Sequence, residues 1–358
     1  MKKIIIDAYP VATPYVGLGE YCRRLGEGLN EHAEELRSEH KTEISFFVPP
    51  KFKGCFGDKV GYIEVAPSFR RMARFLPVKA DLYHVPYQYS RIKYMYFAKK
   101  TLLTIHDINF MYEKKGDELD RSIRKFKERV AHADYVNYIS NFACEDTEKH
   151  FSIGLPKKII YNGVADFPAM ALHNATLPNN LPSDFMFHIS SLRAKKNIHL
   201  LVEMMKYLPE QNLVIAGDWS GAYGEGLLKK IKEEHISNIY TLPNVSETEK
   251  IALYASCRAF LFPSLCEGFG LPPIEAMKFG KPVFLSTLTS LPEIGGRDAF
   301  YWDDLSPKVM ADVVKAKLAD FDANPSVYAE KMKQNANRFN WNRCVEQYIE
   351  YYLEILKS

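Results

Sequence analysis

The chain has 358 residues, of which 47% are hydrophobic and 25% charged, and this mixture is typical of an ordinary soluble globular protein. At this length we expect two domains, each large enough to bury a core of its own. The 47 Lys and Arg residues nearly balance the 44 Asp and Glu residues, and the resulting formal charge of +3 argues against a dedicated nucleic-acid-binding protein.

Short β-type runs alternate with helical patterns along the first half of the chain. Apolar runs predict strands at 4–7, 44–48, 81–85, 101–105 and 135–139. Helical patterns predict helices at 19–32 and 122–133. Continuous apolar strands separated by helices are typical of a parallel sheet covered on both faces, so this half is predicted to be a doubly wound α/β domain.

A segment rich in Pro and Asn interrupts the pattern at 166–184, and we interpret it as an interdomain linker. The alternation then restarts, with strands predicted at 185–189, 213–216, 239–242, 259–262 and 282–285. An amphipathic helix with an aromatic face is predicted at 342–357. We therefore expect two Rossmann-like domains, 1–168 and 169–341, with 342–358 joined to the first. They would face each other across a cleft, with ligands beyond the carboxyl ends of the strands.

Cysteine usage and apolar runs indicate a cytoplasmic location. The six cysteines are scattered and form no Cys-x-x-Cys pair, which indicates free thiols in a reducing compartment. The apolar run near the N-terminus is too short for a signal peptide, and no run approaches the length of a membrane span. Two stretches, 69–76 and 87–100, mix Arg or Lys with large apolar or Tyr side chains. They fit a membrane surface or a phospholipid-linked acceptor as well as a basic face packed on the core, so the inner membrane face is an alternative location.

The most informative segment runs from Phe262 to Met277. A predicted strand ends at Phe262, a Gly-Phe-Gly turn follows at 268–270, and two prolines then open a helix, because Pro suits the first helical turn. Free N–H groups and the helix dipole make such a helix start a site for anions. Glu267 precedes the turn, and Glu275 is expected in the first helical turn, where a carboxylate can accept hydrogen bonds from the two hydroxyls of a ribose. Each glutamate alone is more simply explained as solvated or as a complement to the dipole.

The spacing of Glu, seven residues and Glu resembles the signature of the retaining glycosyltransferases of family four, which have the GT-B fold. The resemblance continues through 281–283 and 291–296. It implies contacts to the donor sugar, backbone contacts to sugar and phosphate, and a contact to the nucleotide ribose. Glu267 is implied to contact the donor sugar. The backbone of Phe269, Gly270 and Leu271 is implied to contact sugar and phosphate, and Glu275 is implied to contact the ribose.

Three cations, Arg193, Lys195 and Lys196, lie between a predicted strand and a helix. Positive charge at a helix start opposes the helix dipole, which favours an anionic partner over a merely solvated face. A departing nucleoside diphosphate is such a partner, since its leaving oxygen gains negative charge as the glycosidic bond breaks. The resemblance assigns Lys196 to the pyrophosphate and leaves open whether Arg193 or Lys195 is its main companion. Ser190 and Ser191, at the start of this segment, are assigned to donor binding.

In the first half of the chain, Gly17 and Gly19 follow the first strand, and Cys22 stands where a dinucleotide-binding motif needs its third glycine. A tight turn explains the two glycines, whereas the resemblance implies a loop whose backbone approaches the donor phosphate and the acceptor. His106 and Asp107 end another predicted strand. A lone His is more often structural, but the family has a His-Asp pair here. It implies that His106 donates to a sugar hydroxyl or polarises the reacting region, while Asp107 sets its orientation or charge.

Three further segments carry weaker signals. Asn244 and Val245 follow a predicted strand where relatives present backbone groups to the nucleobase, and Asn244 replaces the usual Gly, which leaves the base open. The segment 162–164 matches a family motif and is explained equally by an Asn-Gly turn. Asp320 and Asp322 resemble a metal-binding pair, but a solvated loop explains them better. We predict no required metal or cofactor.

The sequence favours a retaining hexosyltransferase acting on a nucleotide sugar. Mannose from GDP-mannose is favoured over a UDP-sugar because the resemblance is strongest to bacterial mannosyltransferases of surface polysaccharide assembly. The acceptor would be a hydroxyl of a glycan or lipid-linked saccharide in polysaccharide or lipopolysaccharide synthesis. One alternative is another GT-B enzyme, an epimerase or a phosphorylase, the latter recognisable by its pyridoxal chromophore. Another is a non-catalytic subunit that binds a sugar nucleotide without turnover.

Overall fold

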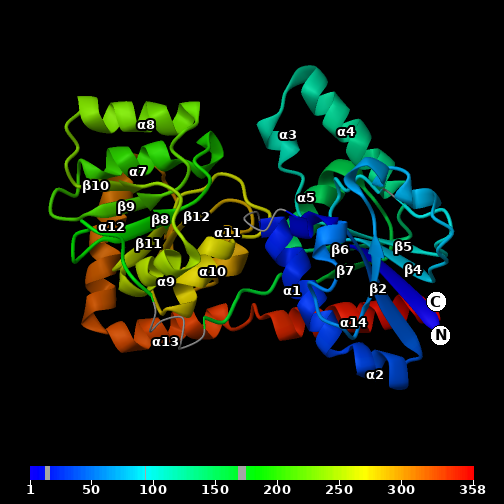
Figure 1. Cartoon of the computed structure of the whole chain (residues 1–358). Helices are drawn as coiled ribbons and strands as arrows, with labels where there is room; N and C mark the ends of the chain where they lie inside the picture. The colour runs from blue at the N-terminus through cyan, green and yellow to red at the C-terminus, as the bar shows by residue number, and fades with distance from the viewer. Residues whose placement is uncertain (13–16, 93, 168–174) are drawn as a thin grey trace. The chain divides into compact units, whose positions relative to one another are not determined.

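The computed structural model describes residues 1–12, 17–92, 94–167 and 175–358 (Figure 1). The chain folds into two compact units, Met1–Gly163 with Phe339–Ser358, and Val164–Arg338. These divisions fall a few residues from the boundaries expected at 168 and 341. The predicted linker, 166–184, is part of the second unit where it is described, and its residues 168–174 lie outside the described residues.

The first unit is built on a parallel sheet with the strand order β3-β2-β1-β4-β5-β6-β7. The strands are β1 (Lys2–Asp7), β2 (Thr42–Val48), β3 (Gly61–Glu64), β4 (Leu82–Val85), β5 (Thr101–Ile105), β6 (Tyr135–Tyr138) and β7 (Lys157–Ile159). The α-helices are α1 (Gly17–Glu31), α2 (Ala33–Ser38), α3 (Phe110–Glu113), α4 (Gly116–Val130), α5 (Asn141–Phe151) and α14 (Trp341–Lys357). Short 3₁₀ turns are η1 (Tyr9–Ala12), η2 (Pro50–Phe52), η3 (Pro67–Phe69) and η4 (Ala73–Phe75).

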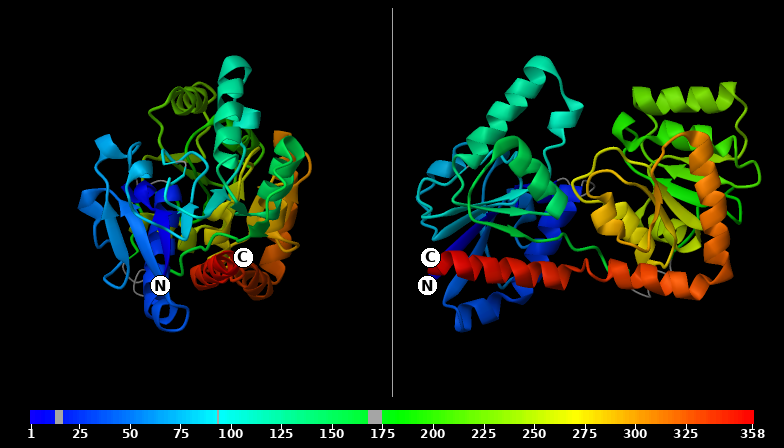
Figure 2. Two further views of the ribbon diagram at one scale, coloured as in Figure 1. Left: turned by 90° about the vertical axis from the view of Figure 1, so that its right-hand side faces the viewer. Right: turned by 180° about the vertical axis from the view of Figure 1, so that it is seen from behind.

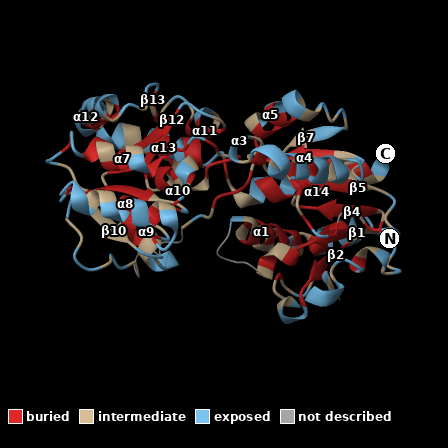
Figure 3. Ribbon diagram, turned by 90° about the horizontal axis from the view of Figure 1, so that it is seen from above, coloured by how far each residue is buried: buried red, intermediate tan, exposed pale blue. Residues whose placement is uncertain are grey.

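Alternate residues of this sheet face opposite cores. On β1, Ile4 and Ile6 belong to one apolar cluster together with Tyr348 of α14. Ile5, between them, belongs to another cluster together with Phe126 of α4. Successive side chains of a strand point to opposite faces, so both faces of the sheet must be covered by helices. Figure 3 shows the buried strands with helices whose outer faces are exposed.

The second unit repeats this plan on a parallel sheet with the order β10-β9-β8-β11-β12-β13. The strands are β8 (Met186–Ile189), β9 (Leu213–Ala216), β10 (Ile239–Leu242), β11 (Ala259–Phe262), β12 (Val283–Ser286) and β13 (Phe300–Trp302). The helices are η5 (Ala194–Lys196), α7 (Ile198–Met205), α8 (Ala222–Glu233), α9 (Glu247–Ser256), α10 (Leu271–Lys278), α11 (Leu291–Gly295), α12 (Pro307–Ala323) and α13 (Pro325–Ala336). Met186 belongs to a core with Leu201 of α7, and the next residue, Phe187, lies against Tyr254 of α9 with ring centroids 5.3 Å apart. The prediction of two parallel-sheet α/β domains is confirmed.

Three strands were not predicted from the sequence: β3, β7 and β13. Each is an outer strand of its sheet. β3 and β7 lack the continuous apolar run that marks a central strand, and β13 has only three residues, whereas β10, the fourth outer strand, was predicted from its sequence. In β7 two of the three residues are Lys157 and Lys158, a type of residue that protects sheet edges from further pairing.

A buried polar network ties α14 to the first sheet, and Figure 2 shows this helix, in red, along the strands. His84 Nδ1 lies 2.7 Å from the Tyr352 hydroxyl, and His84 Nε2 lies 2.7 Å from the Thr104 hydroxyl. The Thr104 hydroxyl donates to Asn137 Oδ1 at 2.7 Å, and Asn137 Nδ2 donates to the Tyr348 hydroxyl at 2.8 Å. Thr104 therefore accepts from Nε2–H, and Nδ1 accepts from Tyr352. Because buried polar groups need partners, this network fixes how α14 lies on β4, β5 and β6.

Buried histidines make the stability of both units depend on pH. Burial lowers the pKa of His84 to about 3 and that of His188, on β8, to about 4. The unfolded chain, with a histidine pKa near 6.5, therefore takes up protons first as the pH falls. The stabilisation is complete above about pH 6.5 and is lost progressively towards the folded-state pKa. We expect the free energy of unfolding to fall by about 2 kcal/mol per buried histidine between pH 7 and pH 5.

Urea unfolding at the two pH values measures this effect. The His84→Gln variant should show a shallower pH dependence than the wild type, whereas His40→Gln, at an exposed position, should keep the wild-type dependence. Equal pH dependence in the wild type and His84→Gln would contradict the prediction.

Among the described residues, no helix is both long enough and apolar enough to cross a membrane.

Candidate functional site

The candidate site is built at the carboxyl edge of the second sheet, where β8 and β11 end side by side. The strand order β9-β8-β11 means that the chain leaves β8 towards β9 on one side and returns at β11 on the other. Residues of α7 belong to the core on one face, whereas α9 lies against Phe187 on the other. Open α/β sheets bind ligands at such a switch point, beyond the strand ends. The loops after β8 and β11 carry the predicted cations and the first predicted glutamate.

Lys196 and Glu267 form an ion pair in this place. Lys196 Nζ lies 2.5 Å from Glu267 Oε1, with side chains only 12% and 13% exposed. Lys196 Nζ also lies 5.2 Å from the ring centroid of Phe262, the last residue of β11. A cation and a carboxylate far apart in the sequence are thus brought together in a shielded position, where charge interacts more strongly than in bulk water.

The backbone of the loop after β8 is hydrogen-bonded to the loop after β11. The Lys195 carbonyl accepts from the Leu265 N–H at 2.8 Å and from the Ser264 hydroxyl at 3.2 Å. The short η5 turn ends at Asn197, whose φ of 59° reverses the chain into α7. These contacts hold Lys196 and Glu267 near each other without depending on their side chains.

The other predicted residues of the cationic segment differ in exposure. Arg193 and Ser191 are exposed, whereas Lys195 is half-buried and its carbonyl is hydrogen-bonded. The division of the cationic role between Arg193 and Lys195 therefore stays a prediction.

His188, which the sequence analysis did not single out, orients Ser190. His188 Nδ1 lies 2.7 Å from the Leu261 carbonyl, so Nδ1 carries the proton, and Nε2 lies 2.8 Å from the Ser190 hydroxyl. Burial lowers the pKa of His188 to about 4; the Lys196 charge adds to this lowering, and the hydrogen bond to Leu261 opposes it without outweighing it. At neutral pH the Ser190 hydroxyl therefore donates to Nε2, and its oxygen lone pairs remain for an incoming donor group.

The Gly-Phe-Gly turn after Glu267 is fixed by side chains from the loop after β12. The Ser290 hydroxyl lies 3.1 Å from the Glu267 carbonyl and 2.5 Å from the Phe269 carbonyl. The Glu267 N–H donates to the Thr289 hydroxyl at 3.1 Å. These supports were not predicted from the sequence, although the Ser/Thr-rich run 286–290, directly after a predicted strand, is the signal that marks them.

Gly270 has a φ of +124°, a conformation that side-chain-bearing residues rarely adopt, and a Cβ placed there would lie 3.2 Å from Leu291 Cδ2. We expect Gly270→Ala to destabilise the protein by about 1–3 kcal/mol and to weaken donor binding, because the turn must change shape. The matched control is Gly226→Ala in α8, where a Cβ meets open space and Ala favours the helix. Thermal unfolding and nucleotide titration of both variants measure the difference. Equal melting temperatures for the two variants would refute the role of the turn.

Glu275 lies in the second turn of α10, not in the first as predicted, because the helix already begins at Leu271. Its carboxylate accepts from the Tyr254 hydroxyl at 2.9 Å and lies 3.4 Å from Lys250 Nζ. Burial alone would lower the pKa of Lys250, but the carboxylates of Glu275 and Glu247 outweigh it and raise the pKa. The lysine therefore stays charged beside Glu275. Lys250 and Tyr254, both on α9, were not singled out from the sequence.

Asn244 and Val245 lie in the loop between β10 and α9, with Asn244 exposed. At the same edge of the sheet, Gly217 follows β9, and a Cβ on it would lie 2.4 Å from the Ser190 carbonyl. Gly217 therefore allows the loops after β8 and β9 to approach closely. Its role was missed because the sequence shows only a Gly-Asp pair after a strand.

In the first unit, the predicted residues gather around the ends of β1 and β5. Gly17 and Gly19 lie in the first turn of α1, not in a loop before it, and residues 13–16 lie outside the described residues. Tyr21 of the same helix lies edge-on to His106, with ring centroids 5.1 Å apart. The first turns of α1 and the end of β5 are therefore neighbours, as the shared sheet edge requires.

The tautomer of His106 differs from the predicted role. His106 Nε2 lies 2.9 Å from the Pro86 carbonyl, which can only accept, so Nε2 carries the proton. Burial lowers the pKa of His106 to about 4, which keeps the ring neutral at pH 7. Its Nδ1 is therefore left as an acceptor, and its contact with a sugar hydroxyl stays a prediction. Asp107 Oδ1 accepts from the Asn109 N–H at 3.0 Å.

The chain passes from the first unit to the second directly after Gly163. A Cβ on Gly163 would lie 2.5 Å from the Trp341 ring, so glycine is needed for this close approach at the start of α14. This packing explains the match at 162–164 without any contact to substrate.

Neither a metal cluster nor a cavity among the described residues points to a different site. Glu35, Glu39 and His40 form an exposed group of possible metal ligands, but they directly precede β2 and so lie at the amino edge of the first sheet. Asp320 and Asp322 lie in α12, not in a loop.

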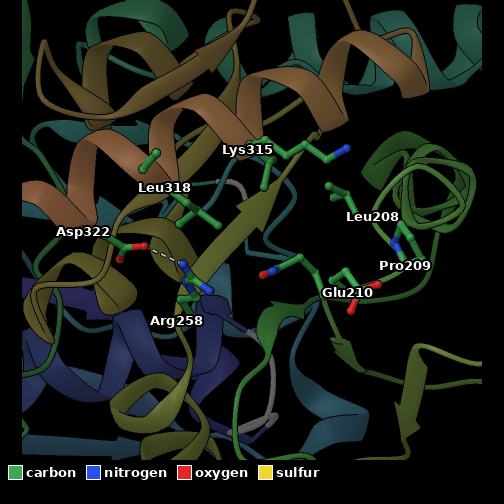
Figure 4. A pocket seen from close by; sticks show the side chains of 10 residues that line it. Leu208, Pro209, Glu210, Arg258, Lys315, Leu318 and Asp322 are labelled. Carbon is green, nitrogen blue, oxygen red and sulfur yellow. Dashed lines mark hydrogen bonds and ion pairs between the residues drawn. The ribbon is translucent and has the colours of Figure 1, made fainter.

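Asp322 instead pairs with Arg258 at 2.5 Å, and this ion pair lines a cavity of about 310 Å³, shown in Figure 4. Arg258 directly precedes β11, and Gln211, also in the lining, lies just before β9. The cavity therefore lies at the amino edge of the second sheet, opposite the candidate site.

Known proteins resemble this chain both in its fold and in the sequence of its second unit. Residues 173–338 match the family model described as glycosyl transferases group 1. The serotype-specific mannosyltransferase WbdA of Escherichia coli is 25% identical over 84% of this chain and 38% of its own length. The O-antigen chain mannosyltransferase B of Escherichia coli is 25% identical over 98% of this chain and 99% of its own. The chain thus spans about two fifths of the length of WbdA.

Solved structures share the architecture at low identity. Sucrose-phosphate synthase of Thermosynechococcus elongatus matches with a TM-score of 0.76 and 18% identity over 100% of both chains. HepE of Anabaena, solved in complex with UDP-glucose, matches with a TM-score of 0.69 and 16% identity over 98% of this chain and 99% of its own. At these identities the likeness concerns the fold, which is that of GT-B glycosyltransferases. Residues 173–338 are therefore similar to the glycosyl transferases group 1 family, and the chain is similar to O-antigen mannosyltransferases at 25% identity.

Proposed function

We propose that this protein is a retaining hexosyltransferase that moves mannose from GDP-mannose to a hydroxyl of a glycan or lipid-linked saccharide. The observation that carries the proposal is the Lys196–Glu267 pair at the switch point of the second sheet. A nucleotide sugar presents a diphosphate and a polyhydroxylated ring side by side, and such a ligand needs a cation next to a hydrogen-bond-accepting carboxylate. Glu275, with Tyr254 and Lys250, supplies a second carboxylate suited to ribose hydroxyls.

In the proposed reaction the bond between the sugar C1 and the β-phosphate oxygen breaks, and a bond from the acceptor oxygen to C1 forms on the same face. The acceptor proton passes to the departing phosphate, which leaves as GDP. Lys196, with Arg193 or Lys195, stabilises the negative charge that grows on the leaving oxygen. Glu267 positions the sugar. No step requires a metal ion or a cofactor, because side-chain cations and the start of α10 neutralise the diphosphate.

The names of relatives support the sugar and the acceptor class. WbdA and O-antigen chain mannosyltransferase B are both described as mannosyltransferases, the latter of O-antigen chains. HepE was solved with a nucleotide sugar, UDP-glucose. We assign Gly17, Gly19, His106 and Asp107 of the first unit to the acceptor side and propose a cytoplasmic enzyme at the inner face of the membrane.

Thermal unfolding with GDP, UDP and ADP and their sugars tests the donor. We expect GDP and GDP-mannose to raise the melting temperature most, since a ligand that binds only the folded state stabilises it by mass action. Release of GDP from GDP-mannose, with the anomeric configuration of the product read by NMR, then tests transfer and retention. The proposal fails if no nucleoside diphosphate or nucleotide sugar raises the melting temperature.

A further inference from the structure

One surface of the first unit has no role in the site described above, and it begins with two 3₁₀ turns, η3 and η4. The backbone N–H groups of Phe69, Met72 and Phe75 each donate to the carbonyl three residues earlier, at 2.9 Å. Side chains three residues apart are eclipsed in 3₁₀ geometry, so these three follow one line. All three are exposed, Phe69 by 67%, Met72 by 55% and Phe75 by 44%.

A second segment extends this line into a patch. The Tyr96 N–H donates to the Arg74 carbonyl at 2.9 Å, and the ring centroids of Phe75 and Tyr96 lie 6.5 Å apart. Phe97 follows, with its ring centroid 5.3 Å from that of Tyr96, and both are exposed. We call Phe69, Met72, Phe75, Tyr96 and Phe97 the apolar stripe. Single exposed apolar residues are normal, but a contiguous group of large ones marks an interaction surface.

The outward position of the stripe is fixed by residues that point inward between its members. Arg70 lies 3.7 Å from the fully buried Asp7 carboxylate and 3.9 Å from the Tyr9 ring centroid. Ala73 is buried, and the Arg74 guanidinium lies 4.7 Å from the Phe75 ring centroid. The segment is therefore anchored to the end of β1, and its phenylalanines cannot turn into the core without breaking a buried ion pair.

The stretch of sequence that carries the stripe is rich in cations. Residues 65–100 contain eight Lys and Arg residues and a single acidic residue, Asp81. Asp81 is itself bound by Lys99 at 2.7 Å. Arg71, which lies between two stripe residues in the sequence, and Arg91 are exposed. Aromatic side chains that enter the headgroup region, together with cations that meet lipid phosphates, are the combination that binds an anionic bilayer.

We infer that the apolar stripe and its cations bind the first unit to the surface of an anionic phospholipid membrane. The inference deepens the proposed function, on which it rests, because a lipid-linked acceptor lies in such a surface. It requires no sugar transfer for its test, since binding to lipid and binding to nucleotide are measured separately.

Co-sedimentation of the full chain with vesicles tests the inference. We expect binding to vesicles of equal parts phosphatidylcholine and phosphatidylglycerol, and little binding to phosphatidylcholine alone. Phe69→Ser combined with Phe75→Ser should lower the partition coefficient by more than about tenfold, because two aromatic side chains no longer leave water. Arg71→Glu should lower it by about tenfold and reduce its salt dependence.

The matched controls are Leu228→Ser and Lys229→Glu, an exposed apolar residue and its neighbouring cation on α8 of the second unit. Both should bind vesicles like the wild type. GDP-dependent stabilisation, measured on the same samples, reports the donor site independently. Absent binding to anionic vesicles, or equal binding by the stripe variants and the wild type, overturns the inference. A stripe-dependent dimer in light scattering, without vesicle binding, also overturns it and identifies a second copy as the occupant.

Discussion

Lys196→Ala should lower kcat/KM for the sugar donor by about a hundredfold to a thousandfold, the usual loss when a group that stabilises a developing oxyanion is removed. The Lys196 side chain is only 12% exposed and is paired with Glu267 at 2.5 Å, so no solvent cation takes its place readily. Most of the loss should appear in kcat, because the charge on the leaving phosphate is larger in the transition state than in bound donor. Steady-state kinetics of GDP release measure the change.

Loss of folding must be separated from loss of catalysis, since removing Lys196 leaves the Glu267 carboxylate shielded and unpaired. The double variant Lys196→Ala with Glu267→Gln should recover thermal stability without recovering turnover. Lys206→Ala is the matched control, because Lys206 also pairs with a glutamate, Glu203, at 2.7 Å. Lys206 lies at the C-terminal end of α7, away from the carboxyl ends of the strands. Wild-type kcat/KM in a folded Lys196→Ala protein would remove this lysine from the reaction.

Glu275→Gln should raise the KM for the donor and leave kcat nearly unchanged. The substitution keeps the shape of the side chain but loses the charge that strengthens hydrogen bonds to ribose hydroxyls. Such contacts bind the substrate and the transition state alike, so kcat/KM should fall by about tenfold to a hundredfold through KM. Isothermal titration with GDP measures the same loss without turnover.

Variants of two neighbours of Glu275 show whether the Glu275 carboxylate itself causes the loss of donor affinity. Glu247→Gln removes the other carboxylate on Lys250, at 3.0 Å, from an exposed position, and should leave nucleotide affinity unchanged. Tyr254→Phe removes the hydroxyl that holds Glu275 and should have a smaller effect than Glu275→Gln. If the Glu275→Gln variant loses as much affinity for a ribose-free diphosphate as it loses for GDP, the glutamate does not bind the ribose.

The sequence predicted those parts of the molecule that follow from strand ends. Central strands such as β1 and β11 are continuous apolar runs, and the residues after parallel strands of one sheet must share one edge, which is why Lys196 and Glu267 were expected at one site. Three of the four outer strands, β3, β7 and β13, were not predicted because each is short or lacks such a run, whereas the outer strand β10 was predicted. Glu275 was placed one turn too early because Gly270, at a φ of +124°, ends the turn sooner than the two prolines suggested.

Roles that depend on which ring nitrogen of a histidine carries the proton could not be predicted from the sequence. Whether His106 donates or accepts is decided by the Pro86 carbonyl, which is distant in the chain and reaches Nε2 only in the folded sheet. The same holds for His188, whose proton is placed by the Leu261 carbonyl on the neighbouring strand. Sequence patterns identify residue types and spacing, whereas tautomers are set by tertiary contacts.

The first unit is discontinuous, because Val164–Arg338 is inserted between its sheet and α14. During synthesis on the ribosome, the seven strands therefore emerge well before the helix whose Tyr348 and Tyr352 complete their polar network. The inserted unit has all its own strands when its synthesis ends, whereas the first unit is complete only with residues 339–358. We therefore expect the inserted unit, although it is made second, to complete its core before the first unit does.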